Sequence, residues 1–191
     1  MPRVHPVPRD QQVGEVAELL GVFTGGGAVL RHQGDHPPLN ALATVVRNPA
    51  LFRVLVPQVR YLANGALPER DRELALLRIA ARVPCPYEWA QHRPAAQQAG
   101  VTDSEIARVA EGLLDDHWDD HDHALLTAVD EMLTKADVAD ETWARLARRY
   151  AEAQLIEFVV LVGEYQKLAI LLNVLRTPID SWLGGDAVPP S

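Results

Sequence analysis

Apolar residues recur along this 191-residue chain with the three-to-four-residue spacing of an α-helix, and this pattern constrains the fold more than any other feature. No run alternates apolar and polar residues between hairpin turns, as a half-buried strand would require. Apolar residues make up 48% of the chain, an ordinary share for a globular protein with a buried core. We therefore predict an all-α fold of about eight or nine helices, in a single domain over residues 1–191.

Prolines, glycines and capping residues mark where the predicted helices begin and end. Pro68 lies in the first turn of one helix, where its missing N–H costs nothing, and Gly100 is a candidate C-cap. Thr102 and Glu105 have the spacing of a capping box, and Pro57 is expected to kink or split its helix. The predicted helices cover residues 11–23, 39–47, 49–64, 67–83, 86–100, 102–111, 122–134, 141–151 and 153–176, and the apolar side of the first is formed by Val13, Val16, Leu19 and Leu20.

Three segments are predicted to lie outside regular structure. Residues 24–38 (TGGGAVLRHQGDHPP) are rich in Gly, His and Pro, which predicts a loop. Their glycine run does not indicate a phosphate-binding loop, because no Gly-Lys-Ser/Thr follows it and no strand precedes it. Residues 1–10 and 180–191 are expected to form extended tails.

Charge and cysteine content exclude several classes of protein. A net charge of −8 without a basic stripe argues against partners such as nucleic acid or an anionic membrane. A single cysteine cannot form an internal disulfide, which fits a reducing cytoplasm. Residues 1–10 lack the apolar core of a signal peptide, and polar residues interrupt the apolar segment 155–175, which predicts a buried helix. We expect a cytoplasmic protein.

The segment 72–100 carries the residues with the greatest chemical capacity. Cys85, Glu88 and His92 have the spacing i, i+3 and i+7, which places them on one helical face, and Glu73 lies on the preceding predicted helix. Side chains of these types can transfer protons near neutral pH, so their convergence predicts an acid/base site. The alternative is a small buried Cys85 that caps a core helix, with Glu88 and His92 as a surface pair.

Residues 67–109 carry a pattern that extends this motif: Arg-Glu-x3-Leu, then Tyr-Glu-Trp-Ala-Gln-His, then Ala-x3-Gly-Val-Thr-x2-Glu-Ile. The pattern resembles the carboxymuconolactone decarboxylase family, which also contains the alkylhydroperoxidase D-like proteins. A weaker likeness extends upstream over residues 48–68 and downstream over residues 155–173. The resemblance implies the alkylhydroperoxidase D-like helical bundle, with residues 67–111 as its core motif. It also implies a homo-oligomer, which we expect as a dimer, trimer or hexamer.

The peroxidase branch of that family has a Cys-x2-Cys pair, a histidine and a preceding glutamate. Matched onto this chain, Cys85 falls at the first cysteine and Glu88 at the second, while His92 and Glu73 match the other two. Glutamate cannot form a sulfenic acid or a disulfide, so the two-cysteine route to peroxide reduction is excluded within one chain. The resemblance therefore favours the decarboxylase-like branch, with a lyase or related activity on a small carboxylated or lactone substrate.

We assign roles on this basis as a hypothesis. His92 is the general acid/base, Glu88 orients it or balances its charge, and Glu73 holds the other end of the relay. No cofactor and no metal ion are expected. Substrate contacts are expected from Tyr87, Trp89, Arg78, Tyr165 and His36, although Trp89 also suits a core position and Tyr165 an inter-helix or subunit contact.

Two other functions remain open at this point. In the first, Cys85 reduces peroxide with the help of an external thiol. The chain would then be an antioxidant protein of the peroxidase type. In the second, the chain is a non-catalytic helical protein that binds a small ligand.

The acidic and histidine-rich run 115–123 (DDHWDDHDH) places His117 and His121 at i, i+4 spacing, which a divalent metal could use. We favour a solvated loop that enters a helix, with Asp120 or Asp122 as its N-cap, because no metal motif is complete there.

Overall fold

The computed structural model describes residues 1–21 and 38–183, and the regular structure of these residues is entirely helical. They form nine α-helices and one short 3-10 turn, without a strand, which confirms the predicted all-α fold. In chain order the elements are η1 (Arg9–Gln11), α1 (Glu15–Gly21), α3 (Asn40–Val45), α4 (Pro49–Ala63), α5 (Glu69–Arg82), α6 (Pro86–Gln98), α7 (Asp103–Glu111), α8 (Asp120–Lys135), α9 (Asp140–Leu146) and α10 (Glu152–Leu175).

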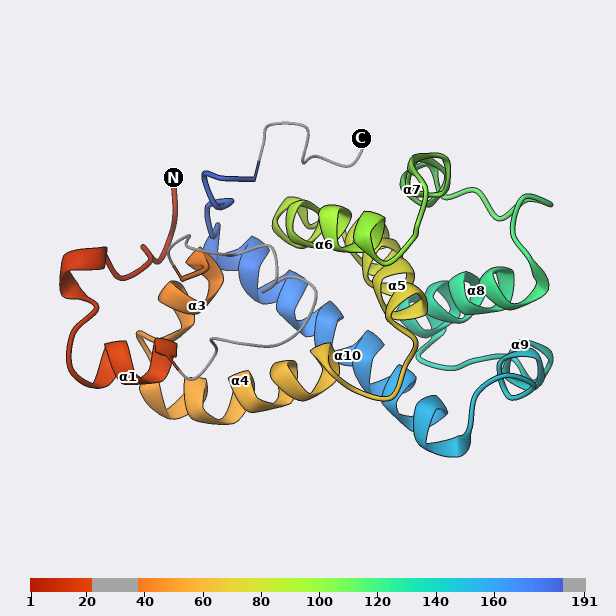
Figure 1. Cartoon of the computed structure of the whole chain (residues 1–191), viewed down its shortest axis with the longest axis horizontal. Coiled ribbons are helices and arrows are strands. Elements are labelled where there is room, and N and C mark those ends of the chain that lie inside the picture. The colour runs from red at the N-terminus through yellow and green to blue at the C-terminus, as the bar shows by residue number, and fades with distance from the viewer. Residues whose placement is uncertain (22–37, 184–191) are drawn as a thin grey trace.

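Helix α5 is the central element, and it contacts α6, α7, α8 and α10 (Figure 1). Every residue from Asp71 to Ala80 is buried, although half of the residues of α5 are charged. A buried charge is tolerated only when it is paired and hydrogen-bonded. The charges of α5 must therefore find partners on the surrounding helices, and these ion pairs lie at the centre of the molecule.

Three apolar clusters surround these ion pairs. The main core cluster joins α5 to α10 and contains Leu74, Leu77 and Phe158 among its fully buried side chains. A second cluster packs the N-terminal segment and α1 against α4 through Leu20 and Phe52. The third is small and consists of Cys85, Tyr87, Ala169 and Leu172.

Two details of the first helices differ from the predictions. Helix α1 begins at Glu15 because Gly14 adopts a φ of +56°, in the left-handed region. Val13 consequently precedes the helix and is 67% exposed, so its predicted place on a buried side is wrong. Pro57 does not split α4, which runs unbroken from Pro49 to Ala63. Both Pro57 and Arg53, whose carbonyl loses its helical partner, are exposed, and solvent can satisfy that carbonyl.

The predicted capping box at the start of α7 is confirmed. The Thr102 side chain accepts a hydrogen bond from the Glu105 backbone N–H, and the Glu105 carboxylate accepts one from the Thr102 backbone N–H. Gly100 has a φ of +91° and follows the last turn of α6, in agreement with the predicted C-cap region. These local signals fix where α6 ends and α7 begins.

Within the described residues, both terminal segments are tied to the helices. The backbone N–H of Arg3 donates to the carbonyl of Leu175, and that of Val7 donates to the carbonyl of Ala43. Asp180 is almost fully buried. Most of the predicted loop, with its glycine run and His36, and residues 184–191 lie outside the described residues. Among the described helices, none combines the length and apolarity that crossing a membrane requires.

Gly65 allows the connection between α4 and α5 to approach α10. The buried Glu157 carboxylate of α10 accepts hydrogen bonds from the backbone N–H groups of Ala66 (2.9 Å) and Leu67 (3.1 Å). A Cβ atom on Gly65 would lie only 2.1 Å from Glu157 Oε1. The carboxylate would have to move, and its hydrogen bonds to the connection would weaken.

We expect Gly65→Ala to lower the free energy of unfolding by about 1–3 kcal/mol, the cost of leaving buried donors unsatisfied. Urea unfolding of the wild type, the single variant, Glu157→Ala and the double variant measures the coupling. The penalty of Gly65→Ala should shrink in the Glu157→Ala background. An equal penalty in both backgrounds would show that Glu157 is not its cause.

Candidate active site

Glu73, Glu88 and His92 meet in one buried cluster, which we call the His92 cluster. His92 Nδ1 lies 2.8 Å from Glu73 Oε2, and His92 Nε2 lies 3.2 Å from Glu88 Oε2. All three residues are more than nine-tenths buried. The imidazole is therefore held between two carboxylates, one on each ring nitrogen.

The sequence between α5 and α6 explains how this cluster forms. The helix break at Pro84 and Pro86 separates the two helices, and Cys85 is the N-cap of α6. The backbone N–H of Cys85 donates to the carbonyl of Ala80 (3.0 Å), which ties the start of α6 to the end of α5. Glu88 and His92 follow at i, i+4 on α6, a spacing that places them on one face.

The two carboxylates determine the charge of His92. Burial by itself would lower the pKa of His92, but the attraction and hydrogen bonds of Glu73 and Glu88 outweigh it and raise the pKa to about 9. Burial would raise the pKa of Glu73, and the neighbouring His92 and Arg72 cations instead bring it below its ordinary value. At neutral pH the cluster is therefore an imidazolium beside carboxylate, and His92 is ready to donate a proton.

Two further side chains border the cluster. Arg72 is buried, and its Nε donates to Glu73 Oε1 over 3.3 Å. The ring of Tyr165 on α10 meets the His92 ring edge to face, with centroids 5.3 Å apart. Burial, with Glu88 and Glu73 nearby, raises the pKa of Tyr165 well above its ordinary value, so its hydroxyl stays protonated. Tyr165 was among the predicted residues; Arg72 was not, because sequence patterns do not show which charges of α5 are buried.

Cys85 is fully buried in the third apolar cluster. Burial and the nearby Glu88 carboxylate raise the pKa of its thiol to about 12, although the Glu88 and Tyr87 backbone N–H groups lower it. A helix N-terminus usually favours a thiolate, but here the other two effects outweigh it. The sulfur is therefore a neutral thiol at physiological pH.

Tyr87 points toward the C-terminal segment. Its hydroxyl donates to Asp180 Oδ2 over 2.6 Å and accepts from the Ala41 backbone N–H over 3.1 Å. Gln91 Nε2 donates to the same Asp180 oxygen over 2.6 Å. Asp180, which no sequence pattern singled out, thus links α3 and α6 to the C-terminal segment, and it fixes the helix that carries Glu88 and His92.

Arg78 and Trp89 lie in structural environments. The Arg78 guanidinium contacts Asp130 Oδ1 at 2.9 Å and Oδ2 at 2.6 Å, and it also donates to the carbonyls of Val109 and Gly112. Its donors are thus directed to α7 and α8. Trp89 is buried in the main core cluster. The structure thus brings Glu73, Glu88, His92 and Tyr165 together and commits Arg78 to contacts with other helices, while His36 lies outside the described residues.

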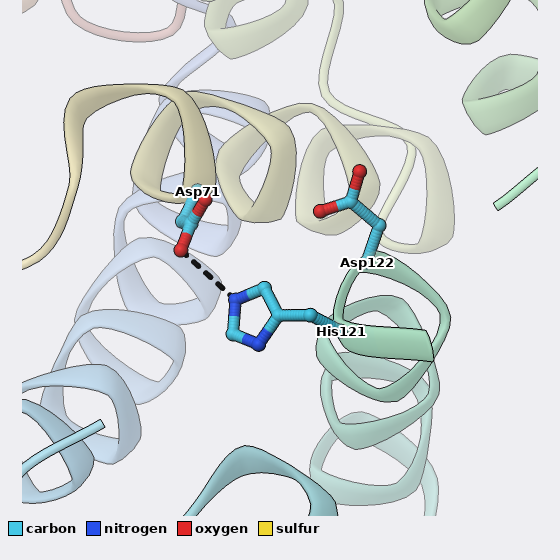
Figure 2. Close-up of side chains that lie close together, drawn as sticks. All are labelled: Asp71, His121 and Asp122. Atoms are coloured by element: carbon cyan, nitrogen blue, oxygen red, sulfur yellow. Dashed lines mark hydrogen bonds and ion pairs between the residues drawn. The ribbon is translucent and has the colours of Figure 1, made fainter. Parts of the chain in front are cut away.

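A second buried network surrounds His121 at the start of α8 (Figure 2). Asp71 Oδ2 lies 2.9 Å from His121 Nε2 and accepts a hydrogen bond of 2.6 Å from the Tyr150 hydroxyl. Arg70 bridges Asp122 (2.8 Å) and Glu105 (2.5 Å). The prediction of a solvated loop in this run is wrong for its last part, because the partners from α5 draw His121 into the core.

The N-cap of α8 also differs from the prediction. Asp119, not Asp120 or Asp122, caps the helix, and its side chain accepts from the Asp122 backbone N–H. One ligand atom each of Asp71, His121 and Asp122 lies within 4.8 Å of the others, which a divalent cation could exploit. The Arg70 cation already balances Asp122, and a metal ion there would sit beside that positive charge. The network is better explained as a clamp between α5, α7 and α8.

A model of the carboxymuconolactone decarboxylase family matches residues 49–131, from the start of α4 to within α8. All three members of the His92 cluster lie in the matched segment. No curated protein matches the sequence significantly.

Solved structures of similar shape include a peroxidase-related protein and a debrominase. A peroxidase-related protein from Ralstonia eutropha JMP134, with an alkylhydroperoxidase AhpD core, gives a TM-score of 0.71 at 14% identity over 92% of this chain and 87% of its own. The debrominase Bmp8 gives a TM-score of 0.72 at 18% identity over 93% of this chain and 92% of its own. A cysteine-to-alanine variant of Bmp8, in complex with 2,3,4-tribromopyrrole, gives a TM-score of 0.71 at 16% identity over 93% and 91% of the two chains. At such identities the likeness establishes the AhpD-like fold alone, as predicted.

Proposed function

Because a model of the carboxymuconolactone decarboxylase family matches residues 49–131 and the chain has the AhpD-like fold, we propose that it is an enzyme that performs cofactor-independent acid/base chemistry, a decarboxylation or a related lyase or isomerase step. The substrate is a small carboxylated compound or lactone. The observation that supports this proposal is the buried His92 imidazolium between the Glu73 and Glu88 carboxylates.

The two sides of His92 have different roles in this proposal. Glu73 forms the shorter contact, to Nδ1, and it is the more deeply buried carboxylate, so it holds the ring and stabilises its charge. Glu88 forms the longer contact, to Nε2, and it has the greater exposed fraction of the two. A substrate can displace Glu88 more readily, and the proton on Nε2 is then the one transferred.

The step can be written with its charges balanced. When a carboxylate next to a conjugated carbonyl leaves as CO₂, the electron pair of the broken C–C bond remains on the substrate as a dienolate. His92 gives its Nε2 proton to a carbon of that dienolate, and the neutral imidazole then takes a proton from water. Hydrogen-bond donors that stabilise the dienolate lower the barrier further; the protonated Tyr165 hydroxyl and the Arg72 cation lie close enough to the cluster to contribute.

The environment of Cys85 disfavours the alternative, a peroxidase that uses an external thiol. Attack on peroxide requires a thiolate, and a thiol with a pKa of about 12 is almost entirely protonated at neutral pH. Its complete burial also keeps it from a second thiol. His92 is already protonated at neutral pH, so it can act as an acid without first changing its ionisation state.

A substrate panel tests the proposal. We expect the wild type to release CO₂ from, or open, at least one member of a panel of carboxylated lactones and β-keto acids. The His92→Gln variant should lose about 10²–10⁴-fold in turnover, the usual contribution of a positioned acid/base, whereas Cys85→Ser should retain full activity. Circular dichroism confirms that both variants are folded.

The opposite pattern would contradict the assignment. Turnover that survives in His92→Gln would remove His92 from the mechanism. Peroxide consumption with an external thiol that disappears in Cys85→Ser would establish the peroxidase. Saturable binding of panel members without turnover would identify a ligand-binding protein.

A further inference from the structure

Three of the four tyrosines are buried, and Tyr165 differs from the other two in its hydroxyl. Tyr87 donates a hydrogen bond of 2.6 Å to Asp180. Tyr150 donates one of 2.6 Å to Asp71. The Tyr165 hydroxyl forms no hydrogen bond with any described residue, although Tyr165 is only 5% exposed. A phenylalanine would fill the same space without the cost of an unpaired hydroxyl, so this hydroxyl is available to a ligand.

The Tyr165 oxygen also borders space that a small molecule can reach. Within the described residues, the side-chain polar atoms that are both sealed from solvent and unpaired belong to Arg108, His121, Arg145, Glu164 and Thr177. The Tyr165 oxygen is unpaired but is not one of these sealed atoms, so it contacts open space. The Tyr165 and His92 rings meet edge to face, with centroids 5.3 Å apart. A ligand at the hydroxyl therefore lies beside the imidazolium.

Arg72 supplies further donors that the described residues leave unused. Its Nε donates to Glu73, but its terminal nitrogens form no hydrogen bond, and Nη2 approaches Glu69 Oε1 only to 3.8 Å. A buried guanidinium normally spends its N–H groups on acceptors. Burial raises the pKa of the Tyr165 hydroxyl, the two carboxylates of the His92 cluster raise it further, and the Arg72 cation lowers it. The hydroxyl and the guanidinium therefore lie close together, beside the same cluster.

The charges around these donors decide which ligand suits them. At neutral pH the His92 and Arg72 cations balance the Glu73 and Glu88 carboxylates, so the site has no net charge. A carboxylate or phosphate concentrates its charge, and a neutral site does not compensate for the hydration that it loses on burial. An enolate or phenolate spreads its charge over a conjugated plane and needs hydrogen-bond donors at one oxygen. The site therefore favours a planar, delocalised oxyanion.

We propose that the Tyr165 hydroxyl and the terminal nitrogens of Arg72 bind the oxygen of a planar, delocalised oxyanion beside His92. This oxyanion site rests on the proposed acid/base function and names the ligand chemistry of the same site. The dienolate of the reaction is one such oxyanion, and a phenolate is a stable molecule of the same class. Because Tyr165 and Arg72 take the oxygen, the Nε2 proton of His92 stays available for a carbon of the conjugated plane.

Binding of 4-nitrophenol tests the oxyanion site without turnover, because its phenolate absorbs visible light and its neutral form does not. The wild type should bind it and lower its apparent pKa, since the donors favour the ionised form. Tyr165→Phe should bind the phenolate about 10–100-fold more weakly, the usual effect of losing a hydrogen bond to a charged group. Both proteins should bind 4-nitrotoluene alike, because its methyl group carries no charge and accepts no hydrogen bond.

Tyr150→Phe is the matched control, since it also removes one buried tyrosine hydroxyl. That hydroxyl lies in the network of His121 and Asp71, so the affinity for 4-nitrophenol should not change. Urea unfolding separates the two hydroxyls. Tyr150→Phe should unfold at a lower urea concentration, because Asp71 loses a donor, whereas Tyr165→Phe should be at least as stable as the wild type. A clear loss of stability in Tyr165→Phe would show that its hydroxyl has a structural partner, and would overturn the proposal.

The kind of anion is tested with 4-nitrobenzoate, which has a localised carboxylate on the same ring. We expect it to bind about 10-fold more weakly than the phenolate, or less. Equal or tighter binding of 4-nitrobenzoate would identify a carboxylate site and overturn the proposal. A wild type that does not bind 4-nitrophenol, or an affinity unchanged in Tyr165→Phe, would overturn it too.

These results are distinguishable from those of the substrate panel. Phenolate binding that depends on Tyr165, without turnover of any panel member, would support the oxyanion site and count against the proposed enzyme. Turnover that depends on His92, with phenolate binding unchanged in Tyr165→Phe, would support the enzyme and overturn the oxyanion site.

Discussion

Replacement of Glu73 by Gln is expected to lower the pKa of His92 from about 9 toward the ordinary value of 6.5, and to lower turnover by about 10²–10⁴-fold. Burial is the largest single effect on His92 and lowers its pKa, and Glu73 exerts the largest of the effects that oppose burial. Glutamine keeps the size of the side chain but removes the charge. Burial of the imidazole would then favour its neutral form, which cannot donate the proton.

The pH profile gives the direction of this effect. Because His92 acts as an acid, wild-type turnover should be high below a pH of about 9 and fall as the pH rises through that value. In Glu73→Gln the fall should begin at a lower pH. Titration of the His92 ring protons by NMR measures the same pKa without a substrate, so it stays informative if the panel yields no turnover.

Glu88→Gln is the matched control, since it removes a carboxylate from the same imidazole. Its contact is longer and its effect on the His92 pKa ranks below that of Glu73, so we expect a smaller shift. A His92 pKa that stays near 9 in Glu73→Gln would show that the Glu73 charge does not keep the His92 ring protonated. The proposed division of roles between the two carboxylates would then be wrong.

The second large effect is expected on stability. Arg78→Met should lower the free energy of unfolding by about 3–5 kcal/mol, because it breaks a buried charge pair and leaves two carbonyls without their donor. The arginine is nearly completely buried, contacts Asp130 through two nitrogens and donates to the Val109 and Gly112 carbonyls. Urea unfolding monitored by fluorescence measures this change.

Arg82→Met is the matched control for Arg78→Met. Arg82 pairs with the same Asp130 through an Nε contact of 3.2 Å, but its side chain is 42% exposed. Exposed ion pairs contribute less than about 1 kcal/mol, so this variant should be close to wild type. If Arg78→Met were as stable as the wild type but had a raised KM, Arg78 would be a substrate contact and its placement in a structural role would be wrong.

Local sequence was sufficient for most of the fold. The Thr102 capping box, the glycine at position 100 and the helical spacing of apolar residues each act within a few residues, and each appears in the structure as predicted. Predictions failed where a local feature was ambiguous. Gly14 moved the start of the first helix to Glu15, later than apolar spacing alone suggested, and Pro57 was tolerated because it faces outward.

The candidate site was only partly predictable from the sequence. The spacing of Glu88 and His92 follows from one helix, and their contact was expected. Glu73 was also expected in the relay, from the family resemblance. The partners of its neighbours Asp71 and Arg72 were not predicted, because a run of adjacent charged residues does not show which of them the fold buries. All three are buried, yet Glu73 reaches His92 while Asp71 reaches His121 on another side of the helix.

The sequence by itself therefore determined the helices, their ends and the residue types available for proton transfer, since these depend on backbone preferences and neighbours a few positions away. The tertiary structure decided which charges are buried and with which partner. Those partners come from distant parts of the chain, as when Tyr150 donates to Asp71 and Tyr87 donates to Asp180. A buried charge must be paired wherever the fold places it, so the pairing, and with it the pKa of His92, exists only once the helices have packed.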